Sequence, residues 1–144
     1  MDDLVSQLVA HPGLYVGPQA DPNEPDAASS VARILVTALP GGSGVMMEYE
    51  VLSADNGRVH GEHAVLARTP RGTVLITSHT HADVTTVLHE TEPGFFPAAD
   101  GDAPFPMSIR LAAPGPGQLV YSWSYGRPGE DLVVRDVGTV RVVE

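Results

Sequence analysis

Four histidines in two short segments are the side chains best suited to chemistry. His60 and His63 lie three residues apart, and His79 and His81 lie two apart. Imidazole titrates near neutral pH and is a common zinc ligand. Residues two apart on a strand point to the same face, so His79 and His81 could act together. The pattern therefore raises two questions: a metal site, and acid–base chemistry at His63, His79 or His89.

The run from His79 to Val84 is similar to the His-x-His-x-Asp-His signature of the metallo-β-lactamases, which implies zinc held at a strand end. Val84 stands in place of the last histidine, and no histidine follows His89 to supply further ligands. A turn between the two histidine segments would place His63 roughly opposite His79 or His81, which allows a cross-strand pair. The ligand set is incomplete, so we expect no metal site.

Strand alternation predicts a plainer role for these histidines. His60 shares a face with Glu62 and Arg68, while His79 and His81 share theirs with Thr77 and Asp83. A strand face of polar residues usually contacts solvent. We therefore expect these histidines to be solvated or hydrogen-bonded on the outer surface.

An aromatic stripe provides the second candidate site. Tyr121, Trp123 and Tyr125 alternate with small or apolar residues, so they share one face of a strand. Flat rings with two hydroxyls are typical of small-molecule pockets, although plain core packing would give the same pattern. Arg110 could pair with a ligand carboxylate, or it could lie on the outside of the sheet.

All three phenylalanines fall in one proline-rich segment, residues 93–106. Three exposed rings in a loop would form an apolar patch, so we expect them to be buried. The prediction is a lid over the mouth of a cavity, with Phe95, Phe96 or Phe105 pointing inward. The alternatives are packing on the outside or against a second subunit, which would make the protein a homodimer. The candidate ligand-binding residues are therefore Met47, Tyr49, His63, His79, Phe95, Phe96, Arg110, Tyr121, Trp123 and Tyr125.

The elements that must position these residues are mostly strands. Residues 2–10 carry the only helical pattern, with Leu4, Val5, Leu8 and Val9 on one stripe. Turn-forming glycine and proline separate short apolar runs, which predict about eight to ten strands. The clearest runs are residues 31–39, 45–53, 59–68, 73–80, 84–91, 107–113, 118–125 and 132–143.

These runs predict a single all-β domain over residues 1–144. The connections are hairpin-length and no second helix provides a crossover, so the sheet should be antiparallel and up-and-down. Several strands alternate, as in Val45, Met47, Tyr49 and Val51, with one apolar face. Closing such a meander into a barrel removes its open edges, and a barrel of this size has room for one small ligand. A two-sheet β-sandwich is the alternative.

The start of the meander resembles a known plan. A short helix precedes Gly13-Leu14-Tyr15-Val16-Gly17, which is similar to the Gly-x-Trp-x-Gly motif in the first strand of calycins: lipocalins, fatty-acid-binding proteins and nitrobindin-like proteins. Tyr15 stands in place of the tryptophan. The resemblance implies a cavity for a small hydrophobic ligand. For nitrobindin-like members it also implies haem, bound by a histidine near the C-terminal end, but this chain has none after His89. No cofactor is therefore expected from the residues themselves.

Charge and composition exclude several classes of function. The chain has 8 Lys+Arg against 18 Asp+Glu, a formal net charge of −10, so nucleic acid and anionic membranes are poor partners. The absence of cysteine rules out disulfides and thiolate chemistry. With no apolar run long enough to span a membrane and an acidic N-terminus, the expected location is the cytoplasm.

These observations favour a binding module that holds a small, largely hydrophobic molecule inside a barrel. The alternative is a small barrel enzyme, such as a cyclase, isomerase or hydrolase, that uses pocket histidines or tyrosines. A third reading is a filled barrel that binds no ligand and serves as an interaction scaffold.

Overall fold

The computed structural model describes residues 3–24, 26–27, 29–53, 57–99 and 101–144. One helix, α1 (Leu4–Ala10), and one 3-10 turn, η1 (Pro40–Gly42), accompany ten strands. The strands are β1 (Gly13–Ala20), β2 (Ser30–Ala38), β3 (Gly44–Ser53), β4 (Gly57–Thr69), β5 (Gly72–His79), β6 (Thr86–His89), β7 (Phe95–Pro97), β8 (Met107–Ala112), β9 (Gln118–Tyr125) and β10 (Val133–Val142).

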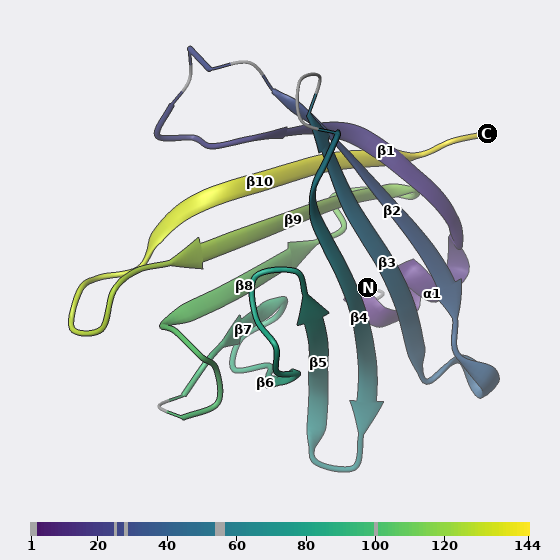
Figure 1. Ribbon diagram of the computed structural model, residues 1–144. Helices are drawn as coiled ribbons and strands as arrows, with labels where there is room; N and C mark the ends of the chain where they lie inside the picture. Colours follow the sequence, from purple (N-terminus) through teal and green to yellow (C-terminus); the bar gives the residue numbers. More distant parts are fainter. Residues whose placement is uncertain (1–2, 25, 28, 54–56, 100) are drawn as a thin grey trace.

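The ten strands form one antiparallel sheet that curls into a nearly closed barrel (Figure 1). Their order is β6-β5-β4-β3-β2-β1-β10-β9-β8-β7. All pairs of neighbouring strands but one are therefore consecutive in sequence. The exception is β1 with β10, which joins the two ends of the chain, for example at Tyr15 and Val142. The seam therefore falls mid-chain, between the edge strands β6 and β7, and Glu92 in the connection between them forms an isolated bridge with Phe95. The predicted up-and-down barrel is confirmed, and the sandwich alternative is wrong.

Apolar side chains fill the inside of the barrel as the alternation predicted. Ile34 and Val36 on β2 and Met47 on β3 are fully buried, while the residues between them point outward. Across the barrel, Leu119 and Tyr121 on β9 complete the same core.

Helix α1 closes one end of the barrel. The Asp3 carboxylate accepts a hydrogen bond of 2.8 Å from the backbone of Ser6 and so caps the helix, while Val5 and Leu8 are buried in the core. Arg68, near the end of β4, donates to Asp3 at 2.7 Å and fixes the helix at that end. The helix was expected over residues 2–10; it begins at residue 4, and residue 2 lies outside the described part of the chain.

Two boundaries differ from the sequence-based prediction. Segment 93–106 is not one loop, because Phe95–Pro97 joins the sheet as β7 and pairs with β8. Pro93 precedes this strand and Pro97 ends it, and proline cannot donate to a ladder, so the sequence pattern concealed the strand. Strand β6 is also shorter than expected. Among the described residues, no helix has the length and apolar character needed to cross a membrane.

Gly17 is required where the two ends of the chain pair. A Cβ at this position would lie 1.9 Å from the carbonyl oxygen of Thr139 on β10. We expect Gly17→Ala to lower the free energy of unfolding by about 3 kcal/mol, at the upper end of overpacking costs, because backbone must move. Gly61→Ala is the matched strand control: its Cβ would meet side chains alone, Thr80 at 3.4 Å and the Arg58 guanidinium at 3.6 Å. The free energy of unfolding of the control should stay within about 0.5 kcal/mol of the wild-type value in urea unfolding. Equal losses in the two variants would show that Gly17 is not specifically required for β1 to pair with β10.

Candidate functional site

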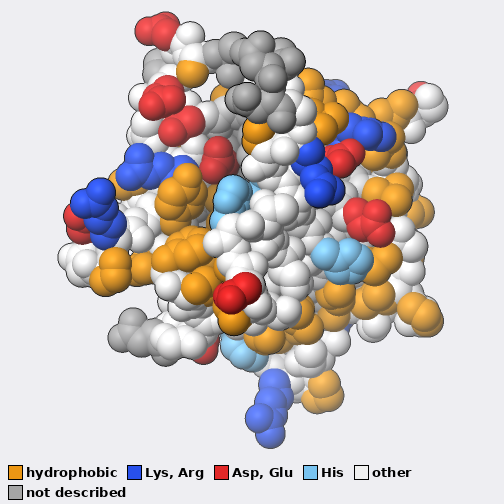
Figure 2. Space-filling view, viewed as in Figure 1, with side chains coloured by type: hydrophobic (Ala, Val, Ile, Leu, Met, Phe, Trp, Pro, Cys, Tyr) orange, Lys and Arg blue, Asp and Glu red, His pale blue; other side chains and the backbone are white. Residues whose placement is uncertain are grey.

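A pocket of about 440 Å³ opens at the barrel end opposite α1. Strands β1, β3, β5 and β9 end around it, and β2, β4 and β10 begin there. The residues lining it are Gln19, Ala20, Asp21, Glu24, Ala27, Ser30, Val51, Val59, His60, His79, His81, Phe105, Trp123, Tyr125 and Asp136. In Figure 2, acidic side chains gather at the upper left, where Figure 1 places the loop after β1, and a histidine lies beside them. The pocket therefore combines aromatic rings, imidazoles and carboxylates.

His79 presents a hydrogen-bond donor that has no partner. Its side chain is buried, with 7% of its surface exposed, and its Nδ1 accepts a hydrogen bond of 3.2 Å from the backbone N–H of His81. A neutral ring that accepts at Nδ1 carries its proton on Nε2. That Nε2 meets no acceptor among the described residues. Burial lowers the pKa of His79, which favours this neutral form.

Trp123 contributes a second unmatched donor beside the first. Its ring packs edge-on to His79, with centroids 5.1 Å apart, and it is 6% exposed. The indole Nε1 is buried and finds no acceptor in the described part of the chain. An unsatisfied buried donor costs about 1–3 kcal/mol, so the two atoms call for an acceptor that the chain does not supply.

Glu62 anchors a polar network beneath the histidines. Its buried carboxylate accepts hydrogen bonds from Tyr121 Oη, from Thr77 Oγ1 at 2.8 Å, and from His60 Nε2 at 3.1 Å. Burial, and secondarily the charge of Glu62, raise the pKa of Tyr121 far above its ordinary value, so this hydroxyl stays a donor. The bond to Glu62 also fixes His60 with its proton on Nε2, which leaves Nδ1 as a lone-pair acceptor.

A second buried pair lies next to this network. Tyr49 Oη donates a hydrogen bond to Gln19 Oε1, and the Tyr49 ring packs edge-on to Tyr121 at 4.8 Å between centroids. Gly138 leaves the space for this pair, because a Cβ there would lie 2.9 Å from the Tyr49 hydroxyl. Burial raises the pKa of Tyr49 as well. The layer below the pocket is thus uncharged except for Glu62.

Asp136 is a half-buried carboxylate in the wall of the pocket. Burial raises its pKa, and the nearby negative charge of Asp21 raises it further, while His60 and His81 act in the opposite direction. Two carboxylates close together disfavour each other's ionisation. Burial and the charge of Asp21 therefore both favour the protonated form of Asp136.

The expected site residues separate into two groups. Seven lie inside the barrel or at the pocket: Met47, Tyr49, His79, Phe96, Tyr121, Trp123 and Tyr125. Of these, Met47 and Phe96 are fully buried in the core and do not line the pocket. Tyr125 lies at the rim and is 38% exposed.

The other three expected residues point away from the interior. His63 pairs with Glu48 and Ser78 on the outer face, so it is not opposite His79 or His81 as predicted. Arg110 is exposed and its guanidinium lies 4.5 Å from the ring centroid of Phe95, so that these two side chains cover each other outside the barrel. Of the three phenylalanines, Phe105 lines the pocket, and its ring packs against His79 with centroids 6.1 Å apart.

The outer face assigned to His60 and His79 is wrong, although His60 does hydrogen-bond, to Glu62, and His81 is exposed as expected. His60 and Glu62 do share a face, as do His79 and Thr77, but both faces point into the barrel. Stacked rings of His60 and His81, with centroids 5.2 Å apart, line the pocket. Glu62 was not recognised as a partner, and its i, i+2 spacing from His60 was the signal available.

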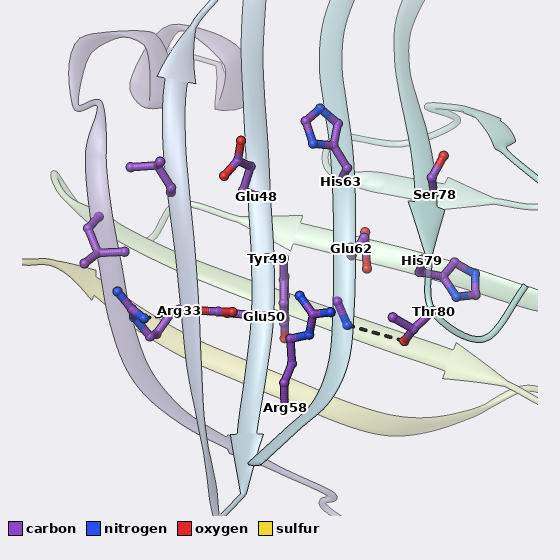
Figure 3. Close-up of a pocket in the computed structure, with 13 residues that line it drawn as sticks. Arg33, Glu48, Tyr49, Glu50, Arg58, Glu62, His63, Ser78, His79 and Thr80 are labelled. Carbon is purple, nitrogen blue, oxygen red and sulfur yellow. Dashed lines mark hydrogen bonds and ion pairs between the residues drawn. The ribbon is translucent and has the colours of Figure 1, made fainter.

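A broader groove of about 660 Å³ lies on the outer face of β2–β5 (Figure 3). Arg33 and Glu50 form an ion pair of 3.0 Å there, and the N–H of Gly61 donates to Thr80 Oγ1 at 3.3 Å. The ion-paired Arg33 and Glu50 side chains are well exposed to solvent, and surface ion pairs of this kind are weak. The barrel-end pocket is therefore the stronger candidate.

The side chains that could bind a metal ion or a haem iron are considered in turn. No group of three or more histidine and carboxylate side chains in the described part of the chain is arranged to hold a metal ion. The haem implied by the calycin resemblance would need a histidine from the C-terminal strands. Strands β9 and β10 present Trp123, Tyr125 and Asp136 to the pocket and contain no histidine. The residues present thus do not match that ligand.

Fold and site together define an antiparallel barrel with a polar, aromatic pocket at its open end. The crystal structure of Rv2717c from M. tuberculosis is similar, with a TM-score of 0.64, 17% identity, and coverage of 97% of this chain and 95% of that chain. At this identity the similarity shows the fold alone. No protein-family model and no curated protein matches the sequence.

The burial of His79 makes stability depend on pH. Its folded-state pKa lies below the ordinary value of 6.5, so the unfolded chain binds the proton more tightly. The free energy of unfolding should therefore fall as the pH drops from about 6.5 to 5. His79→Gln should flatten this part of the curve in urea unfolding at a series of pH values. An unchanged slope in the variant would show that His79 does not contribute.

Proposed function

We propose that this protein binds a small, mostly apolar molecule with a hydrogen-bond acceptor in the barrel-end pocket. The observation that carries the proposal is the pair of buried donors, His79 Nε2 and Trp123 Nε1, in the wall of a pocket of about 440 Å³. Pockets of this size, with aromatic walls and few polar groups, are typical small-molecule sites. The proposal agrees with a calycin-like grouping, which stays a prediction.

Aromatic rings supply the apolar part of the site. Trp123 stands deep in the wall, and Phe105 and Tyr125 pack edge-on at the rim, with centroids 6.3 Å apart. Phe105 precedes β8 and is half-buried, so it can cover a bound molecule in the way expected of a lid. A ligand ring stacked here would remove apolar surface from water and satisfy a donor in one step.

A second candidate function is acid–base catalysis in the same pocket. The specific observation is the bond between His60 and Glu62, since a buried carboxylate holds the imidazole in one tautomer. A substrate that is turned over by the wild-type protein and not by Glu62→Gln would identify this enzyme. The expected homodimer likewise stays a prediction, which a solution mass measurement checks.

Nile red, a neutral planar dye with a carbonyl acceptor, tests the binding proposal. We expect saturable brightening on titration, because the dye would enter an apolar site. Phe105→Ser should weaken binding about fivefold, as loss of a half-buried ring removes about 1 kcal/mol. Phe95→Ser is the matched control, since this ring lies outside under Arg110. It should leave binding unchanged.

Two results would contradict the proposal. One is the absence of saturable brightening in a folded wild-type protein. The other is an equal loss in Phe95→Ser and Phe105→Ser, which would place the dye outside the barrel. Native mass spectrometry of the purified protein gives an independent readout, because a co-purifying organic mass lost in the Phe105 variant supports the same pocket.

A further inference from the structure

We infer that the pocket selects a small aromatic cation, meaning a protonated amine carried on a ring. The inference rests on the proposed binding function and names the ligand class for the same pocket. It follows from the charges that line the pocket, from the rings beside them, and from the two unmatched donors below.

Three carboxylates line the pocket, and its described lining residues include no lysine or arginine. The three are Asp21, Glu24 and Asp136. None of the three forms an ion pair with an arginine or histidine in that part of the chain. A concave site lined by one sign of charge concentrates ligands of the opposite sign. The chain as a whole, with a net charge of −10, adds to this field.

The aromatic rings suit a cation as well as an apolar ring. An ammonium over the face of a tryptophan or tyrosine is attracted by the π system, and more strongly where water is excluded. The protein's own Arg135 already places its guanidinium 5.9 Å from the ring centroid of Tyr125. That contact shows that this rim accommodates positive charge. Trp123 and Phe105 supply further rings in the pocket wall.

The unmatched donors require that the cation also carry an acceptor. His79 Nε2 and Trp123 Nε1 are more than nine-tenths buried within their residues and have no described acceptor. A phenol or ether oxygen on the ring would accept from one of them, while the ammonium lies toward Asp136 at the rim. The three pocket carboxylates and the two unmatched donors are separate observations. One molecule with an ammonium and an acceptor oxygen would interact with both.

Acid should weaken the binding of such a cation. His60, His79 and His81 all line the pocket beside the carboxylates, with Glu62 beneath them and Arg135 beside Tyr125. Protonation of His79, which packs against Trp123, would add positive charge next to the ligand. Protonation of Asp136 would remove negative charge, and its pKa is raised by burial and by Asp21. Both effects have the same sign.

Three phenols of similar shape test the charge preference: tyramine as the cation, 4-ethylphenol as the neutral compound, and 3-(4-hydroxyphenyl)propionate as the anion. We expect tyramine to bind about tenfold more tightly than 4-ethylphenol by isothermal titration calorimetry, and the anion to bind least. The affinity for tyramine should fall as pH is lowered from about 7 to 5.

Two variants separate the pocket carboxylate from overall charge. Asp136→Asn should lower the affinity for tyramine about tenfold and change that for 4-ethylphenol by less than about twofold. Glu48→Gln removes the same charge from the exposed outer face of β3 and should leave both affinities within about twofold. Thermal unfolding of each variant establishes that it is folded.

The results distinguish this inference from the binding function. Equal affinities for tyramine and 4-ethylphenol, or tightest binding of the anion, overturn the cation preference. If Nile red binds and none of the three phenols does, the cation preference is wrong and the proposed binding function is retained. If neither Nile red nor any phenol binds the folded protein, the proposed function itself is wrong.

Discussion

The interior of this barrel depends on one buried carboxylate. The side chain of Glu62 is inaccessible to solvent, and an ionised carboxylate removed from water needs several donors to be tolerated. Its donors come from three places: His60 on the same strand, Thr77 on the neighbouring strand, and Tyr121 on β9. Since β4 and β9 are separated in the sheet by β3, β2, β1 and β10, the bond to Tyr121 spans the barrel. It therefore sets the width of the barrel at the level where the pocket begins.

This arrangement divides the barrel into two ends with different physical roles. At the α1 end, Val5, Leu8 and Tyr15 are buried, and the hydroxyl of Tyr15 is satisfied by the carbonyl of His11 at 2.6 Å. At the other end, buried polar groups outnumber the partners available to them. The α1 end stabilises the barrel through apolar burial, whereas the pocket end retains buried donors without a partner among the described residues. Binding sites are commonly placed in this way, on variable segments held by a rigid scaffold.

The sequence predicted the strands better than the site, and the reason is physical. Period-two alternation gives which residues share a face, so His60 with Glu62 and His79 with Thr77 were paired correctly. It does not give which face is inside unless one face is clearly apolar. Strand β4 carries apolar residues on both faces, as Val65 and Leu66 illustrate, so its polar residues were assigned to solvent.

The remaining errors have a related origin, because sequence pattern reports on one strand at a time. Arg110 was expected either to pair with a ligand or to lie outside the sheet, and Phe95 was one of three candidate lid residues. Pairing of β7 with β8 brings the two side chains together on the outside. Neither that pairing nor the bond between Glu62 and Tyr121, residues 59 apart, is a local property. The pocket combines side chains from both halves of the chain, and only the closure of β1 on β10 brings them together.

The unmatched donors give the strongest physical reason to regard the open end as functional. A barrel that served only as a scaffold would gain stability from an apolar side chain at position 79, because a buried donor without an acceptor costs about 1–3 kcal/mol. Instead, His79 and Trp123 keep such donors side by side, beneath a rim that adds the mutual repulsion of Asp21 and Asp136. The buried donors need a hydrogen-bond acceptor, and the carboxylates at the rim need a positive charge. A single bound molecule with both groups relieves them together, which is why the same features that lower the stability of the empty barrel would favour a specific ligand.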